Sequence, residues 1–162
     1  MLAAFHGPAF SQRSDLEEAN RLFKQGQLDS ALERVNAYLE GHPKDARGRF
    51  LKGVIFTEQK KTSDALRIFV DLTHEYPELA EPYNNLAVIY AGQGEYEKAR
   101  TALEMAIRAN PGYAAAHENL GDIYAKMAAQ SYDKAATLNR DNKSAATKLN
   151  LIKEILSKPG GR

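Results

Sequence analysis

Cysteine is absent from this 162-residue sequence. Its absence excludes disulfide bonds, thiolate metal sites and thiol nucleophiles, and leaves the redox character of the compartment open. The sequence also lacks an excess of either charge, because 22 basic and 21 acidic residues give a formal net charge of +1. Neither nucleic acid nor an anionic membrane surface is therefore expected as a partner on electrostatic grounds.

Long apolar runs are missing too. No stretch approaches the roughly 20 residues that span a bilayer, so we expect no membrane insertion. Residues 1–11 are mildly apolar and lack a basic start, although the small residues Ala9 and Ser11 flank Phe10 as in a signal-peptidase site. This segment is either a disordered terminus, which would fit a cytoplasmic protein, or a signal-peptide remnant of an exported, periplasmic one; the missing basic region favours the first.

Patterns typical of enzymes and metal carriers are not found. A zinc site needs three or four convergent ligands, and the four histidines form neither an HxxxH nor an HExxH motif. The carboxylate pairs Glu17–Glu18 and Glu95/Glu97 are typical of solvated helix faces, and Gly92 and Gly94 belong to a helix turn rather than to a phosphate-binding loop. We therefore expect no catalytic residues, no cofactor and no metal.

What the sequence does contain is a period of 34 residues. The blocks 12–45, 46–79 and 80–113 align without a gap. Two residue types recur at this spacing, a proline (Pro43, Pro77 and Pro111) and an alanine (Ala31, Ala65 and Ala99). Coincidence is a poor explanation for such a match, and the period indicates a repeat architecture.

Each block reads as a pair of antiparallel helices. Small residues recur at the eighth position (Ala19, Gly53 and Ala87) and at the twentieth, where two helices would approach closely. Larger residues recur on the intervening faces and would fill the space between helices (Leu22, Phe56, Tyr90, Val35, Phe69 and Leu103). Glycines at "GQ" 26–27 and "GQGE" 92–95 supply turns, and each proline ends the second helix. The predicted fold is all-α.

The third block, "AEPYNNLAVIYAGQGEYEKARTALEMAIRANPGY", closely resembles a tetratricopeptide repeat (TPR). It matches that family's signature at Tyr83, Leu86, Ala87, Tyr90, Gly94, Tyr96, Ala99, Ala106 and Pro111. The first block departs from the signature at Asp15 and Glu18, and the second has Lys60 where a turn glycine is usual. The resemblance covers about residues 12–142 and implies a right-handed α-solenoid that binds other proteins without chemistry. The chain is also similar to small bacterial TPR proteins of undefined role, some of them exported.

The fourth block, 114–142, opens normally with "AAAHENLGDIYAK" and then lacks a turn. No glycine or proline occurs from Asp122 to Leu138, and a register that restored a turn would bury Asn139 and Asn142. We infer that five residues have been deleted and that about Ala114 to Asn139 forms one helix. Its predicted apolar stripe is Ile123, Tyr124, Met127, Ala128, Ser131, Ala135 and Leu138.

The second half of this long helix needs a covering element. Residues 143–162 are predicted to supply a capping helix and tail, with Asn142 as N-cap, folding back through "NRDN". The alternative is a second copy of the chain, giving a homodimer. Its possible face comprises Met127, Tyr132, Ala135, Leu138, Leu149 and Ile152.

The resemblance implies that the first helices of the repeats line a concave groove for a peptide or partner protein. The predicted groove residues are Leu16, Asn20, Phe23, Phe50, Leu51, Val54, Asn84, Asn85, Val88, Asn119 and Asp122. The family's carboxylate clamp needs basic residues where this chain has Leu16, Leu51, Glu81 and Asn85, so an acidic tail is not the expected ligand. His117, in place of an aromatic residue, is predicted to be a packing residue.

Overall fold

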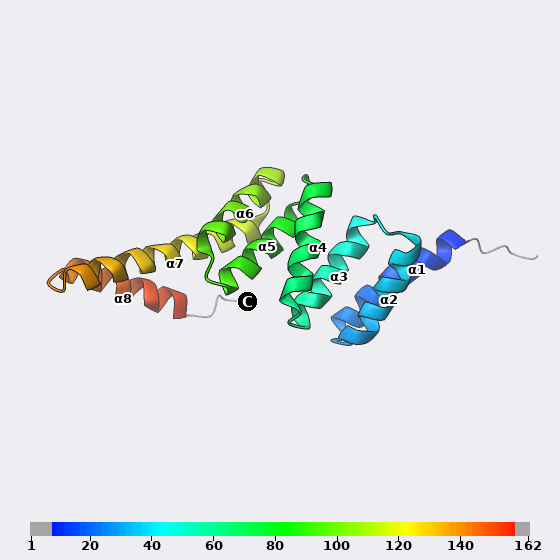
Figure 1. Ribbon diagram of the computed structural model, residues 1–162, viewed down its shortest axis with the longest axis horizontal. Helices are drawn as coiled ribbons and strands as arrows, with labels where there is room; N and C mark the ends of the chain where they lie inside the picture. The colour runs from blue at the N-terminus through cyan, green and yellow to red at the C-terminus, as the bar shows by residue number, and fades with distance from the viewer. Residues whose placement is uncertain (1–7, 158–162) are drawn as a thin grey trace, which may run out of the picture. The chain divides into compact units, whose positions relative to one another are not determined.

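A computed structural model describes the backbone of residues 8–157 and the side chains of residues 15–157. In this part of the chain every regular element is a helix (Figure 1), which confirms the predicted all-α fold. The described residues fall into two compact units that divide between Glu78 and Leu79.

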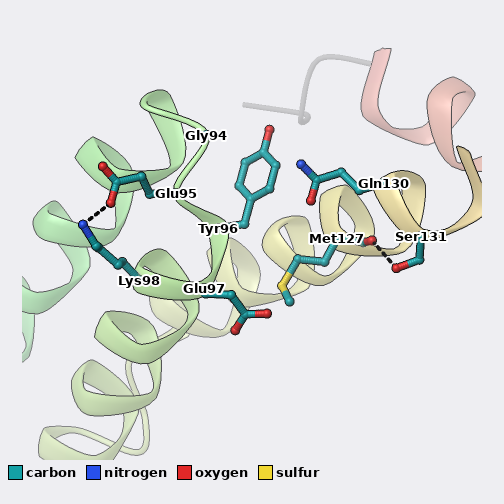
Figure 2. A pocket seen from close by; sticks show the side chains of 8 residues that line it. All are labelled: Gly94, Glu95, Tyr96, Glu97, Lys98, Met127, Gln130 and Ser131. Carbon is teal, nitrogen blue, oxygen red and sulfur yellow. Dashed lines mark hydrogen bonds and ion pairs between the residues drawn. The ribbon is translucent and has the colours of Figure 1, made fainter. Parts of the chain in front are cut away.

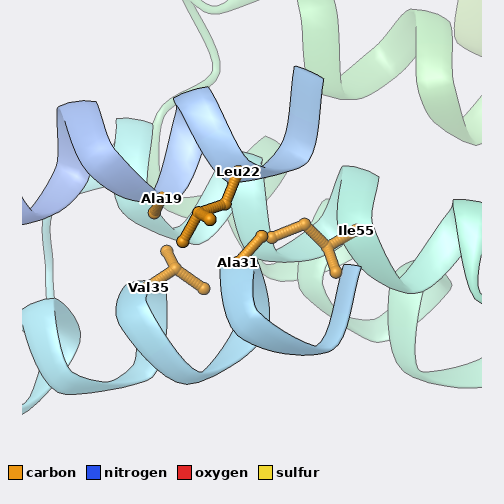
Figure 3. Close-up of a cluster of buried hydrophobic side chains, with 5 residues drawn as sticks. All are labelled: Ala19, Leu22, Ala31, Val35 and Ile55. Atoms are coloured by element: carbon orange, nitrogen blue, oxygen red, sulfur yellow. The ribbon is translucent and has the colours of Figure 1, made fainter. Parts of the chain in front are cut away.

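The first unit contains two helical hairpins. Its helices are α1 (Pro8–Lys24), α2 (Leu28–Gly41), α3 (Ala46–Glu58) and α4 (Thr62–Glu75). Helix α1 packs on α2, α3 packs on α4, and α2 and α1 both contact α3. The core between the hairpins holds Ala19, Leu22, Ala31, Val35 and Ile55 (Figure 3), so the small residues do lie where the helices approach closely.

Helix α1 begins earlier than the repeat alignment suggests. Residues 8–11 form the first turn of α1, so they are not disordered, and the alternative of a signal remnant stays a prediction. Pro8 is the first residue of the helix, a position at which its fixed φ angle suits the helix and its missing N–H costs no hydrogen bond. Residues 1–7, on which the rest of that expectation depends, lie outside the described part of the chain.

The three regular hairpins turn through one backbone conformation. The residues at the turn are Gly26, Lys60 and Gly94, spaced 34 apart, with φ angles of 73°, 61° and 77°. Only glycine adopts this left-handed region without a steric penalty, so Lys60 is strained.

Lys60→Gly is therefore expected to raise the free energy of unfolding by about 1 kcal/mol. Lys61→Gly is the matched control, because Lys61 has an ordinary φ of −82° and should gain nothing. Urea denaturation followed by circular dichroism measures both, and equal effects of the two substitutions would contradict the strain at Lys60.

The second unit begins with one more hairpin and ends differently. Its helices are α5 (Ala80–Gly92), α6 (Tyr96–Ala109), α7 (Ala114–Leu138) and α8 (Lys143–Ser157). Helix α5 packs on α6, and α7 packs on both. The predicted fusion of the fourth repeat is confirmed, because α7 is one helix of 25 residues.

The predicted cap is also confirmed. Helix α8 packs on α7 (Figure 1), and the Oδ1 of Asn142 accepts a hydrogen bond of 3.0 Å from the backbone N–H of Ala145, as an N-cap does. Lys148 of α8 places its Nζ 5.5 Å from the ring centroid of Tyr132 in the second half of α7. The chain thus supplies cover for the outer half of its own long helix.

The expectation of one unbroken apolar stripe along α7 is wrong. Ile123 is buried, but Ser131 is exposed, Tyr124 is 49% exposed and Leu138 is 74% exposed. The part-buried residues from Ala125 onward include three of the predicted stripe, Met127, Ala128 and Ala135, together with Ala125, Lys126, Ala129, Tyr132 and Ala136, which were not predicted. The reason is that α7 has different neighbours along its length: α5 and α6 meet its first half, whereas α8 lies along its second half.

Candidate functional site

The inner face of the second unit, formed by α5 and the first half of α7, carries a pocket. Its volume is about 310 Å³. Its lining residues are Ala87, Val88, Ala91, Gly92, Leu103, Asn119, Asp122, Ile123 and Lys126. The predicted groove residues Val88, Asn119 and Asp122 therefore meet at one place, and Val88 stands 50% exposed there.

The asparagines of this face are engaged with the chain itself. Asn119 donates from Nδ2 to the Oδ1 of Asn84 at 2.8 Å, which ties α7 to α5. Asn85 donates from Nδ2 to the backbone oxygen of Glu81 at 2.9 Å, within α5. Because these two amide groups are hydrogen-bonded within the chain, the exposed side chains of Val88 and Asp122 are better candidates than the asparagines for contacting a ligand.

The inner face is acidic. Residues 80–92 and 114–126 contain Glu81, Glu118 and Asp122 and one basic residue, Lys126, which lines the pocket. These three carboxylates are exposed and form no ion pair with a basic side chain of the described residues. Burial and the negative charge of Glu81 raise the pKa of Tyr113, which follows from placing a phenol beside a carboxylate. Lys126 places its Nζ 5.9 Å from the ring centroid of Tyr96. With three carboxylates and one lysine, the face is net negative around the pocket.

In the first unit, most of the predicted groove residues contribute to packing. Leu16, Phe23 and Leu51 are part-buried against the core of that unit. The ring of Phe50 lies 5.7 Å from that of Phe69 on α4, centroid to centroid. Val54 is half-buried, and Asn20 is exposed. The apolar character seen in the sequence is thus largely internal.

A second pocket lies where α7 runs past the start of α6 (Figure 2). Its volume is about 420 Å³, and its lining residues are Gly94, Glu95, Tyr96, Glu97, Lys98, Met127, Gln130 and Ser131. Glu95 pairs with Lys98, and the hydroxyl of Ser131 donates to the backbone oxygen of Met127 at 3.0 Å. Sequence reasoning missed this pocket, although the missing turn of the fourth block was the signal for it.

The residues of the possible dimer face are covered to different degrees. Leu149 is 8% exposed, whereas Leu138 is 74% exposed. Met127, Tyr132, Ala135 and Ile152 are part-buried. Leu151 and Ile155 on α8, which the sequence did not single out, are 56% and 64% exposed.

No group of three or more potential metal ligands occurs among residues 15–157. The expectation that His117 packs in the interior is wrong, because its side chain is exposed and its Nε2 lies 3.0 Å from the backbone oxygen of Pro111. No helix in the described part of the chain is long and apolar enough to cross a membrane.

Comparisons with known proteins agree with the repeat. Two family models, both described as tetratricopeptide repeat, match residues 16–80 and 56–123. A curated relative is the chloroplastic tetratricopeptide repeat domain-containing protein PYG7 of Arabidopsis thaliana, 32% identical over 82 residues, which are 48% of this chain and 27% of that protein. The chain spans less than half the length of the curated relatives it matches.

Solved structures share the fold at low sequence identity. A thermophilic TPR protein of Thermus thermophilus superimposes with a TM-score of 0.67 at 22% identity, over 90% of this chain and 83% of that one. The first TPR domain of Spaghetti (RPAP3), bound to the HSP90 peptide SRMEEVD, gives a TM-score of 0.67 at 18% identity, over 77% of this chain and 99% of that one.

Proposed function

Because this chain belongs to the tetratricopeptide repeat family, we propose that it is a non-enzymatic interaction module that binds a peptide segment of a partner protein on the inner face of α5 and α7. The pocket beside Val88 carries this proposal. A side chain that is 50% exposed at the edge of a 310 Å³ pocket offers apolar surface to a ligand. Fully burying one aliphatic anchor of a peptide contributes about 1.5–3 kcal/mol.

The charges of the face define the partner segment further. A peptide with a small aliphatic anchor flanked by lysine or arginine would complement Glu81, Glu118 and Asp122. The RPAP3 domain was solved with an acidic peptide, but this chain has Glu81 and Asn85 at two of the places where a carboxylate clamp needs basic residues. The proposed ligand therefore has the opposite charge.

Val88→Asp is expected to weaken the binding of peptides selected from a random library by about tenfold or more. The substitution removes apolar surface and adds a fourth negative charge, while the exposed position of Val88 leaves the helix packing intact. The matched control is Leu151→Asp on α8, which replaces another exposed aliphatic residue away from the pocket. Fluorescence polarisation of labelled peptides compares the three proteins.

Selected peptides should be enriched in basic residues, and their affinity should fall as salt is added. Binding that Val88→Asp and Leu151→Asp weaken equally would rule out the inner face. If the selected peptides are not enriched in basic residues but their binding still depends on Val88, the inner face is the binding site and the proposed preference for basic peptides is wrong.

A second candidate is self-association through the α7–α8 hairpin. It is favoured by the exposure of Leu138, Leu151 and Ile155, three large aliphatic residues on that hairpin. Measuring the molecular mass of the wild type, Val88→Asp and Leu151→Asp in solution distinguishes self-association from peptide binding. A dimer that Leu151→Asp dissociates and Val88→Asp does not would support self-association, and a monomer at micromolar concentration would remove it.

A further inference from the structure

In the regular hairpins, the first helix meets its own second helix through the fourth, eighth and eleventh positions of the block. At the fourth position, Asp15 pairs with Arg34 at 3.7 Å and Arg49 pairs with Glu75 at 2.8 Å. At the eighth position, a Cβ placed on Gly53 would lie 2.7 Å from the ring of Phe69. At the eleventh position, Leu22 is 9% exposed, and Phe56 and Tyr90 are part-buried.

The same three positions of the fourth block are uncovered. They hold His117, Gly121 and Tyr124, which we call the vacant slot. His117 and Gly121 are exposed, Tyr124 is 49% exposed, and among the described residues no atom lies within 4 Å of a Cβ placed on Gly121. The cause is the fusion of the repeat, because α7 continues straight and α8 lies along its second half.

We propose that the vacant slot receives a helix from a partner protein, which supplies the missing second helix of the fourth repeat. The three regular hairpins show the chemistry that fits. Their second helices each present an alanine followed four residues later by a large apolar residue: Ala31 and Val35, Ala65 and Phe69, Ala99 and Leu103, all 0% exposed. The partner helix therefore carries the pattern Ala-x-x-x-(Val, Phe or Leu).

The residue types of the slot suit this occupant. Gly121 has no side chain, so a helix can approach as closely as α4 approaches Gly53. Tyr124 offers an aromatic ring for the large apolar residue and a hydroxyl that remains at the edge. The Nε2 of His117 lies 3.0 Å from the backbone oxygen of Pro111, which leaves its Nδ1 for a polar contact with the partner helix, at the position where Asp15 and Arg49 form ion pairs in their hairpins.

The vacant slot is separate from the inner face. Asp122 and Lys126 line the inner pocket, whereas Gly121 and Tyr124 are not among its lining residues. Successive residues of a helix point about 100° apart, so the two surfaces occupy different faces of α7. A partner helix and an inner-face peptide can bind together, and the slot stands without the proposed function.

The probe is a synthetic peptide with the sequence of α6, residues 96–109, added to the full-length ¹⁵N-labelled protein. An isolated helix of this length is marginal in water, so we expect saturation only at millimolar peptide. Amide chemical shifts should change around residues 117–124. The protein variant Gly121→Leu should weaken binding at least about tenfold, because its side chain fills the slot. Thr137→Leu, at an exposed position further along α7, should leave the affinity unchanged.

A second probe removes any dependence on how the protein variant folds. In the same peptide, Ala99→Leu puts a bulky residue at the helix contact and should also weaken binding at least about tenfold. The absence of shifts at millimolar peptide would overturn the proposal, as would shifts centred on Val88 and Asp122 or equal binding of the two peptides.

Discussion

Gly53→Ala is expected to lower the free energy of unfolding by about 1–3 kcal/mol, whereas Gly121→Ala is expected to raise it by about 1 kcal/mol. The two glycines occupy the same position of the repeat, and both lie inside helices. Their surroundings differ. A Cβ on Gly53 would meet the buried ring of Phe69 at 2.7 Å, and one on Gly121 would meet no atom of the described part of the chain within 4 Å.

The opposite signs follow from two competing effects. Alanine stabilises a helix by about 1 kcal/mol relative to glycine, and at Gly121 no steric clash opposes this gain. At Gly53 the gain is outweighed, because the ring of Phe69 is 0% exposed and has no space into which to move. Thermal and urea denaturation of the two variants measures the difference.

Phe69→Leu provides the control for the clash at Gly53. Where the eighth position is alanine in the third repeat, Ala87, the facing residue is Leu103. Gly53→Ala combined with Phe69→Leu should therefore cost at least about 0.5 kcal/mol less than the sum of the single substitutions. Simple additivity would contradict direct contact between the two positions.

Gln130→Pro is expected to destabilise the second unit by about 3 kcal/mol or more. Gln130 is an exposed residue in the middle of α7. Proline at this position removes a helical hydrogen bond and kinks α7, so α8 loses the straight surface against which it packs. Gln130→Ala is the matched control and should be nearly neutral.

Hydrogen exchange locates the effect of the proline. Protection should be lost from about residue 126 to the end of α8, while α5 and α6 keep theirs. If the chain instead turned at this point, proline would be tolerated, and the two variants would have similar stabilities.

The periodicity of the sequence was sufficient to predict the helices, because small and large residues at fixed positions define which faces meet. The fusion of the fourth repeat was also predictable, from the absence of glycine and proline between Asp122 and Leu138. The sequence did not predict that the fusion would leave side chains of the fourth repeat exposed. His117 was expected to pack because its position packs in other repeats, but the helix it would pack against is missing.

The sequence also did not predict how deeply each side chain is buried or which helices pack against one another. A repeat position tells which side of a helix a residue takes, but not how far its neighbours cover it, so it did not reveal that Phe50, which is predicted to line the groove, also contacts Phe69. The stripe predicted along α7 assumed one partner for a helix that has different partners in its two halves. The pocket between α6 and α7 arises from two helices whose relative placement the sequence did not give.

The straightness of α7 is the feature from which the vacant slot, the second pocket and the cap all follow. Since the chain has no native cysteine, Glu118→Cys and Asp133→Cys allow two spin labels to be attached at exposed positions of α7. Electron paramagnetic resonance should give a separation of about 22 Å between the labelled backbone positions, the rise of 15 helical residues. A separation of about 10 Å, as between the axes of two helices packed side by side, would show that the chain reverses between the two labels and would contradict a continuous α7.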